Sequence, residues 1–202
     1  MASIYDLKPA FQRLLRPLVR GWARAGATPN HVTIAALVLS FAVGALIVWR
    51  PAARWPLLLL PAALLVRMAL NALDGMMARE LGMASRLGAV LNELGDVLSD
   101  AALYLPLALV PGIAAAPVVV AVVLAVITEM AGVVAIQIGA TRRYDGPMGK
   151  SDRALVFGAL ALVLGLGARA GRWVAVLLWL VVALLLLTIW NRARRALREG
   201  PA

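Results

Sequence analysis

The chain has 202 residues, of which 63% are hydrophobic and only 15% are charged. A soluble domain is about half apolar with about a quarter of its residues charged, so this composition excludes an ordinary soluble fold and predicts an integral membrane protein. The net charge of +10 indicates anionic membrane lipids as partners, and not nucleic acid, because no soluble segment remains to bind it.

The first thirty residues form the first predicted element, an amphipathic cytoplasmic arm. Apolar side chains recur at helical spacing between Tyr5 and Ala25, and basic side chains occupy the other faces. This pattern is typical of a helix in the membrane interface, and a solvent-exposed arm is the alternative. The apolar positions are Phe11, Leu14, Leu15, Leu18 and Trp22, and the basic ones are Lys8, Arg13, Arg16, Arg20 and Arg24.

Six apolar segments follow the arm, and most are about as long as the roughly 20 residues that span a bilayer. Because only short loops join them, we expect one all-α membrane domain: a six-helix bundle over residues 31–190 and a basic tail over residues 191–202. The predicted transmembrane helices are Val32–Trp49, Trp55–Ala78, Gly88–Val110, Pro117–Gly139, Ala154–Gly167 and Trp173–Trp190.

The loop charges predict the orientation of the bundle. If the N-terminus is cytoplasmic, the cytoplasmic loops carry most of the Lys and Arg residues, as the positive-inside rule requires. The opposite side then carries only Arg50, Arg54, Arg169 and Arg172. We therefore expect both termini and the active site on the cytoplasmic side of a bacterial inner membrane.

Polar residues gather where the second segment ends and the third begins. Asn71 and Asp74 share one helical face, and Asn92, Asp96 and Asp100 recur every four residues on the next helix. Two antiparallel helices would direct these faces toward each other, and polar groups at this depth are costly unless they bind a ligand or line a wet cavity. Oxygen ligands of this kind suit a hard cation such as Mg²⁺ or Mn²⁺.

The residues around these ligands indicate a pyrophosphate substrate. Gly75, Ala78 and Gly88 have little side-chain bulk, so a phosphorylated ligand can approach the backbone. Arg79 offers a planar guanidinium for phosphate. A metal ion would neutralise the leaving phosphate, and a carboxylate would accept the proton of an attacking hydroxyl.

The string NALDGMMARELGMASRLGAVLNELGD, residues 71–96, resembles the signature of the CDP-alcohol phosphotransferases, also called phosphatidyltransferases. That signature runs Asp-x2-Asp-Gly-x2-Ala-Arg-x8-Gly-x3-Asp-x3-Asp. The basic arm, the TPNHVT string at 28–33 and the six-helix plan are also similar to this family. The chain matches the signature at Asp74, Gly75, Ala78, Arg79, Gly88 and Asp96, and departs from it at Asn71 and Asn92, which replace the first and third aspartates.

The resemblance implies roles for the signature residues. In the family four aspartates serve a two-metal centre, and the last is the proposed general base. Carried over, Asp74 is a metal ligand and Asp96 a ligand or the catalytic base. Asn71 and Asn92 offer only neutral amide oxygens, so the number of bound ions, one or two, is left open. Glu93 and Asp100 can restore negative charge.

The resemblance also places the segment after Pro29 at the nucleotide pocket. Asn30 and Thr33 would then bind the CDP group together with Gly75, Ala78, Arg79 and Gly88. The alternative for Asn30 is a helix cap beside Pro29.

The loop over residues 141–154 is basic, which the positive-inside rule alone explains. Its GKSD string, however, stands where a span begins, and helix N-termini bind anions. We therefore expect Lys150, Arg153 and Arg142 to bind phosphate or the acceptor. The arginines of the C-terminal tail are assigned to topology and lipid binding.

Three ionisable residues lie at similar depth inside the second, third and fourth spans: Arg67, Asp100 and Glu129. Charges at that depth persist only if they are paired or wet. We therefore expect Arg67 to pair with Asp100, Glu129 or both beneath the metal site.

The function that these patterns and the resemblance imply is transfer of a phosphatidyl group from a CDP-linked lipid donor, such as CDP-diacylglycerol, to an alcohol acceptor, with release of CMP, in phospholipid biosynthesis. Transfer from a soluble CDP-alcohol to a lipid hydroxyl is one alternative. A non-catalytic CDP-lipid-binding or transport protein is the other. A homodimer is expected from the resemblance and from glycines that suit close helix packing.

Overall fold

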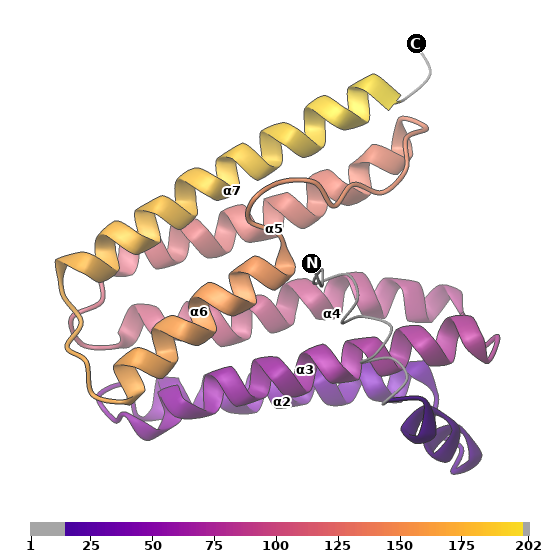
Figure 1. Ribbon diagram of the computed structural model, residues 1–202, viewed down its shortest axis with the longest axis horizontal. Coiled ribbons are helices and arrows are strands. Elements are labelled where there is room, and N and C mark those ends of the chain that lie inside the picture. The colour runs from indigo at the N-terminus through magenta and orange to yellow at the C-terminus, as the bar shows by residue number, and fades with distance from the viewer. Residues whose placement is uncertain (1–14, 200–202) are drawn as a thin grey trace, which may run out of the picture. The chain divides into compact units, whose positions relative to one another are not determined.

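The computed structural model describes residues 15–199, and within them every regular element is a helix (Figure 1). Residues 15–24 are helical. The later elements are α2 (Pro29–Trp49), α3 (Trp55–Glu80), α4 (Arg86–Tyr104), the 3-10 helix η1 (Leu105–Leu109), α5 (Ala115–Gln137), α6 (Lys150–Gly165) and α7 (Arg172–Glu199). The all-α class is confirmed, and each predicted segment lies on a helix.

The two largest differences between the predicted and observed helix ends are in the third segment and in the last one. The third segment is α4 followed by η1, because Pro106 has no N–H to donate to the carbonyl of Ala102 and the α-helix ends before it. Gly44 packs so closely on that carbonyl that a Cβ would overlap its oxygen. The last helix runs on to Glu199 through most of the predicted tail, whose Ala, Arg and Leu residues are good helix formers.

Among residues 15–199, four helices are long and apolar enough to cross a membrane: α2, α3, α5 and α7. The composition of α4 differs, because Arg86, Glu93, Asp96 and Asp100 interrupt its apolar residues. α6 has only 16 residues. The chain is therefore a multi-pass membrane protein.

The chain divides into two compact units, of which the first lies within residues 1–42 and 62–99. Its core joins the helix of residues 15–24 to α2 and α3. Only part of the predicted apolar face of this helix is exposed. Leu15 is buried in this core, whereas Leu18 and Trp22 are exposed. Phe11 and Leu14 lie outside the described residues. The buried core residues are Leu15, Val19, Val32, Leu73, Met76 and Met77.

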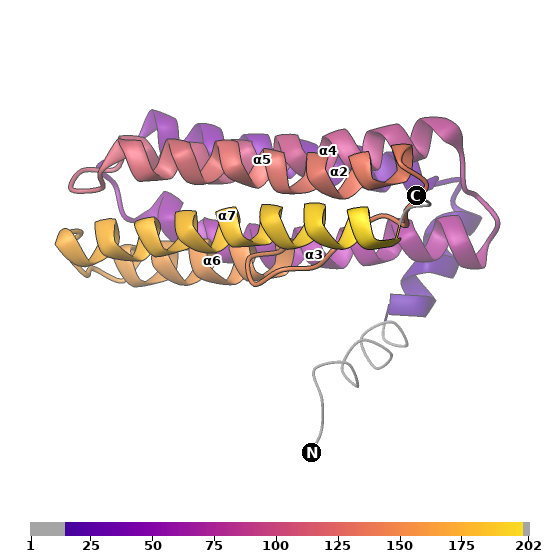
Figure 2. The ribbon, with the colours of Figure 1, turned by 90° about the horizontal axis from the view of Figure 1, so that it is seen from above.

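The second unit lies within residues 43–61 and 100–202. In it α5 and α7 run side by side, as Figures 1 and 2 show. Ala135 of α5, Ala140 of the loop after α5, and Ala196 of α7 form a buried cluster. These small residues let the two helices and that loop approach closely. Tyr104 stacks on Phe157 of α6 with ring centroids 4.3 Å apart.

The loop between α5 and α6, residues 138–149, is fixed to α7. The backbone N–H of Met148 donates to Thr188 Oγ1 at 3.0 Å. Gly146 has φ of +118° and lies against Thr188, where a Cβ would clash and an L side chain would be strained. The loop that carries the predicted phosphate-binding residues is therefore held in place by α7.

Candidate active site

In the first unit, the start of α2 meets the signature residues of α3 through Thr33 and Asp74. Thr33 Oγ1 lies 2.9 Å from Asp74 Oδ2 and 3.0 Å from the carbonyl oxygen of Pro29, one turn earlier. Asp74 is buried, with 5% of its surface exposed. The hydroxyl that donates to the carboxylate offsets part of the cost of this burial and orients the side chain.

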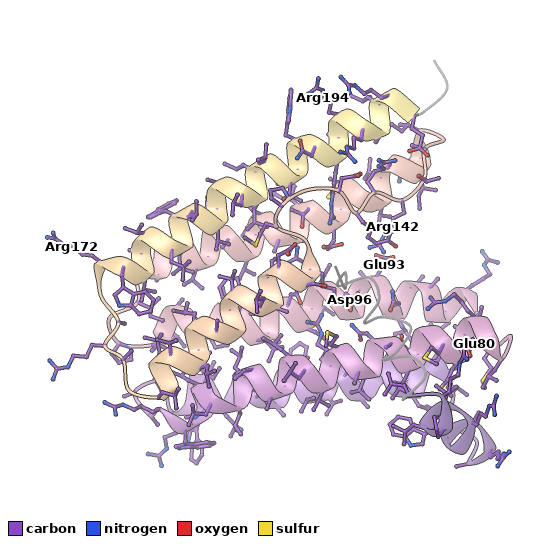
Figure 3. The ribbon with its side chains drawn as sticks, in the orientation of Figure 1. Glu80, Glu93, Asp96, Arg142, Arg172 and Arg194 are labelled. Atoms are coloured by element: carbon purple, nitrogen blue, oxygen red, sulfur yellow. The ribbon has the colours of Figure 1, made fainter. Side chains whose placement is uncertain are left out.

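Asp96 of α4 receives two side chains of α3. Asn71 Nδ2 donates to Asp96 Oδ1 at 3.2 Å. Arg67 Nη2 donates to the backbone oxygen of Asp96 at 2.9 Å and lies 3.5 Å from Oδ1. The predicted faces of these two helices therefore meet, and Figure 3 labels Asp96 and its neighbour Glu93 on α4.

The small signature residues have the close contacts that their size suggests. The guanidinium of Arg79 folds over Gly75, where a Cβ would lie 2.9 Å from Nη2. Asn30 lies against Gly88, where a Cβ would lie 2.9 Å from Asn30 Oδ1. Ala78 and Asn92 are partly buried on their helices.

Asn30 is not the cap of α2, because Pro29 is already its first residue. Thr28 has that position: its Oγ1 accepts from the N–H of His31 at 3.4 Å, and its own N–H donates to His31 Nδ1 at 3.3 Å. The helix-cap interpretation of Asn30 is therefore wrong, and its side chain is directed to Gly88.

In the second unit, Arg153 of α6 lies between two carboxylates. Its Nε and Nη2 donate to Asp100 Oδ2 at 3.1 and 2.9 Å, and Nη2 also donates to Glu129 Oε1 at 2.9 Å. Only 1% of Arg153 is exposed. The sequence predicts that Arg67 pairs with these carboxylates, and the structure shows Arg153 between them. The pairing of Arg67 with either stays a prediction.

Glu129 binds two further arginines through its other oxygen. Arg192 Nη1 lies 3.4 Å and Arg142 Nη2 3.5 Å from Glu129 Oε2. Arg192 is 1% exposed and also donates to the backbone oxygens of Thr128 and Asp145. We define Asp100, Glu129, Arg142, Arg153 and Arg192 as the buried charge cluster, in which three arginines meet two carboxylates.

Sequence reasoning missed Arg192 by assigning it to topology. A signal for its burial was present, because Leu185, Thr188, Arg192 and Ala196 recur every three or four residues on α7 and all are buried. Lys150 is the first residue of α6 and is partly buried. Arg142 also contacts Tyr144, donating to its hydroxyl at 2.7 Å.

The first unit contains oxygen donors of the kind that a divalent cation needs. Within residues 15–199, no three His, Cys, Asp or Glu side chains are grouped so that they could hold a metal ion. Asp74 and Asp96 nevertheless supply carboxylate oxygens, and Asn71 and Asn92 supply amide oxygens. Donors of this kind are hard and suit Mg²⁺ or Mn²⁺, so their chemistry fits, with fewer negative charges than four aspartates provide.

Two relatives show how far the sequence similarity extends. Inner membrane protein YnbA of Escherichia coli strain K12 is 46% identical over 198 residues, which cover 96% of each chain. Phosphatidylinositol phosphate synthase of Mycobacterium marinum is 41% identical over 99 residues, which are 48% of this chain and 40% of that protein. The match to that synthase is therefore partial.

Solved structures of the phosphatidylinositol phosphate synthase of Mycobacterium tuberculosis share the fold. The structure with CDP-DAG bound superposes with a TM-score of 0.78 at 24% identity, covering 94% of this chain and 96% of that one. The structure in complex with manganese and citrate has a TM-score of 0.76, also at 24% identity, and covers 92% and 90%.

The family model described as CDP-alcohol phosphatidyltransferase matches residues 27–190. That range contains both α3 and α4 with their signature residues, and it leaves out only the arm and the end of α7. The chain therefore belongs to the CDP-alcohol phosphatidyltransferase family and is a membrane-embedded transferase of that type.

Proposed function

We propose that the chain transfers a phosphatidyl group from CDP-diacylglycerol to an alcohol, releasing CMP, in the phospholipid biosynthesis of a bacterial inner membrane. The observation that carries this proposal is the pair of signature carboxylates, Asp74 and Asp96, each held by polar contacts from another helix. The CDP-DAG-bound relative and the inner-membrane relative support the choice of donor and location.

In the proposed reaction the acceptor's hydroxyl oxygen attacks the phosphorus of the phosphatidyl group. The bond from that phosphorus to the bridging oxygen breaks, CMP leaves with the bridging oxygen, and a phosphodiester forms. Asp96 accepts the hydroxyl proton. Its Oδ1 is held by Asn71, so its orientation is set before substrate binds.

Asp74, Asp96, Asn71 and Asn92 are the residues that would hold Mg²⁺ or Mn²⁺, for which the manganese-bound relative gives support. The ion supplies positive charge that stabilises the leaving phosphate. Recognition of the CDP group is assigned to Arg79 and to the residues around it. These are Asn30, Thr33, Gly75, Ala78 and Gly88. Gly75 packs against Arg79, and Gly88 packs against Asn30.

The acceptor is proposed to carry an anionic group, such as a phosphate, that Arg142 and Lys150 bind. Arginines outnumber carboxylates by three to two in the buried charge cluster, and Arg142 is its partly exposed member. Guanidinium groups bind phosphate well, which favours an anion as ligand. Arg153 is already paired with Asp100 and Glu129, so it would support this group's binding by holding the cluster together.

We further propose that α4 and α6 also cross the membrane, which gives six spans in one domain, with both termini and the active site cytoplasmic. The pairing of Asp100 on α4 with Arg153 on α6 supports this. Charged side chains are costly inside a membrane unless they are paired, and here each charge has an opposite one beside it. The amphipathic helix is proposed to lie in the interface, with Leu18 and Trp22 toward lipid. The homodimer of the resemblance remains part of the proposal.

The experiment that tests the function is release of CMP by the purified protein from CDP-diacylglycerol, with Mg²⁺ or Mn²⁺ and a panel of alcohols with and without phosphate. A parallel assay offers a soluble CDP-alcohol and diacylglycerol. Acceptor-dependent CMP release from CDP-diacylglycerol, lost in Asp96→Asn, supports the proposal. Release only from the soluble donor contradicts the choice of donor. No release from either donor, by protein that binds CDP compounds, contradicts catalysis.

A further inference from the structure

Three connections between helices lie together at the end of the second unit opposite to the loop over residues 138–149 (Figures 1 and 2). They are residues 50–54 before α3, residues 110–114 before α5 and residues 166–171 before α7. The guanidinium of Arg54 lies over Gly167, where a Cβ would lie 3.0 Å from Nη1. Gly112 packs against Ala170, where a Cβ would lie 3.1 Å from the Cβ of the alanine. These contacts join the three connections into one surface.

This surface carries four exposed arginines, which we define as the arginine surface: Arg50, Arg54, Arg169 and Arg172. Figure 3 labels Arg172 at the start of α7. The segments that build this end of the unit, residues 43–61, 101–128 and 153–198, contain no Asp or Glu. The arginines of the buried charge cluster, in contrast, face Asp100 and Glu129. The described part of the second unit therefore supplies no carboxylate at this end to balance the arginine surface.

Tryptophans adjoin these arginines. Trp49, Trp55 and Trp173 are between 44% and 65% exposed, and each is next to an arginine in the sequence. The guanidinium carbon of Arg50 lies 4.6 Å from the centroid of the Trp49 ring. Trp173 Nε1 donates to the carbonyl oxygen of Arg169 at 3.0 Å, which fixes this ring beside the loop. Because tryptophan prefers the level of the lipid head groups, these side chains place the arginine surface at that level.

We propose that the arginine surface binds anionic phospholipid head groups, with Arg54 and Arg169 as the principal phosphate ligands. A guanidinium binds a phosphate through two parallel N–H donors, and Arg54 is already held against the loop that carries Arg169. A head group with net negative charge balances the arginines, whereas a zwitterionic one does not. None of these residues belongs to the candidate active site, so the inference does not depend on the proposed reaction.

The competing interpretation is that the arginines only anchor the helix ends in any head-group layer, as arginines that flank transmembrane helices do. That interpretation predicts no preference between anionic and zwitterionic lipid. These are also the four arginines that the predicted orientation places on the non-cytoplasmic side, where the positive-inside rule disfavours them. A bound anionic head group would reduce the excess of positive charge on that side.

The test is a lipid titration that is measured at the arginine surface. Because the chain has no cysteine, Ala52→Cys accepts a single environment-sensitive fluorophore at an exposed position between Arg50 and Arg54. The labelled protein in detergent is titrated with short-chain phosphatidylglycerol and, in parallel, with phosphatidylcholine of the same chain length. The fluorescence should report binding of phosphatidylglycerol that is at least about tenfold tighter than that of phosphatidylcholine.

Arg54→Gln with Arg169→Gln, in the labelled protein, should weaken binding of phosphatidylglycerol by at least about tenfold, because both phosphate ligands are lost. The matched control is Arg194→Gln with Arg198→Gln, which removes the same charge from exposed positions near the other end of α7. It should change the affinity measured at position 52 by less than about twofold, because exposed charges beyond the Debye length are screened.

Selectivity for phosphatidylglycerol that is lost only in the first double variant supports the proposal. Equal affinity of the labelled parent protein for the two lipids overturns it, and this result does not require any arginine variant to fold. An equal loss in the two double variants also overturns it, since binding then follows net charge and not this surface. A fluorescence response to inorganic phosphate that equals the response to phosphatidylglycerol would show a site for small anions and would likewise reject the lipid as ligand.

Discussion

Arg153 of α6 donates to Asp100 of α4 through two guanidinium nitrogens, Nε at 3.1 Å and Nη2 at 2.9 Å. Both side chains are almost fully buried, with 1% and 7% of their surfaces exposed. The second carboxylate of the same guanidinium, Glu129, comes from α5. One side chain therefore ties three helical segments together by charge.

Arg153→Met should destabilise the protein strongly. It leaves two buried carboxylates without their shared partner, and breaking a buried pair in this way costs about 3–5 kcal/mol. A fall in the Tm of the detergent-solubilised protein measures it. Arg194→Met, at an exposed position of α7, is the control and should change Tm little. An equal small change in both variants would show that the pairing does not stabilise the fold.

Asp96→Asn should lower turnover by a factor of about 10²–10⁴, because general-base catalysis contributes that much. Binding of CDP should remain measurable, since the proposed nucleotide contacts are unchanged. Steady-state CMP release and CDP titration are the two measurements. Glu80→Gln, on the same unit but at the end of α3, serves as the control. Retention of a third of the wild-type rate in Asp96→Asn rules out the assignment.

Thr33→Val should weaken Mn²⁺ binding by about tenfold, because a hydrogen bond to a charged group contributes about 1.5–3 kcal/mol. The hydroxyl of Thr33 lies 2.9 Å from Asp74 Oδ2, and valine keeps the shape without the donor. Thr33→Ser keeps the donor and should bind Mn²⁺ like the wild type. If valine and serine behave alike, the hydroxyl does not position Asp74.

Removal of metal should abolish CMP release. The leaving phosphate then lacks the charge that stabilises it, and Asp74 and Asp96 have no ion to hold. Excess chelator should stop the reaction, and Mn²⁺ or Mg²⁺ added beyond the chelator should restore it. Full turnover in excess chelator would exclude a metal-dependent mechanism.

The ion pairs of Asp145 should help to hold the loop over residues 138–149 to α7, and this contribution should be lost only at acidic pH. Burial raises the pKa of Asp145, but Arg143, whose Nε donates at 2.8 Å, and Arg195 outweigh it and hold that pKa below its ordinary value. A lowered pKa stabilises the fold above the ordinary carboxyl pKa of about 4 and ceases to do so as pH falls through the folded-state value. The attachment is therefore expected to be constant between about pH 5 and 8.

The measurement compares Tm for the wild type and Asp145→Asn over a pH series. The difference should be steady at neutral pH and shrink as pH falls below about 4, because the wild-type carboxylate then becomes neutral as well. A difference that grows on acidification would contradict the sign of the pKa shift.

Sequence alone located the helices and the two faces that carry the signature residues. Hydrophobic run length fixes the helices, and the spacing of Asn71 and Asp96 brings them together once α3 and α4 are antiparallel. The partners of Asp100 and Glu129 were not predictable in this way. Arg153 is 53 residues from one and 24 from the other, and that contact depends on how α6 packs. Depth along a helix does not by itself give the direction of a side chain, so the pairing of Arg67 with Asp100 or Glu129 stays a prediction.

The three arginines around Glu129 have a consequence for the order of synthesis. The ribosome makes α5 before it makes these arginines. The mean hydropathy of α5, 2.6, lets the helix enter the bilayer although it contains one acidic residue, Glu129. Its partners emerge from the ribosome later: Arg142 after 13 residues, Arg153 after 24 and Arg192 after 63. Arg142 and Arg153 can therefore balance the charges of Asp100 and Glu129 before α7 is made, and a nascent chain that ends before Arg192 lacks only the third arginine. Assembly of this unit is complete only when the last helix arrives.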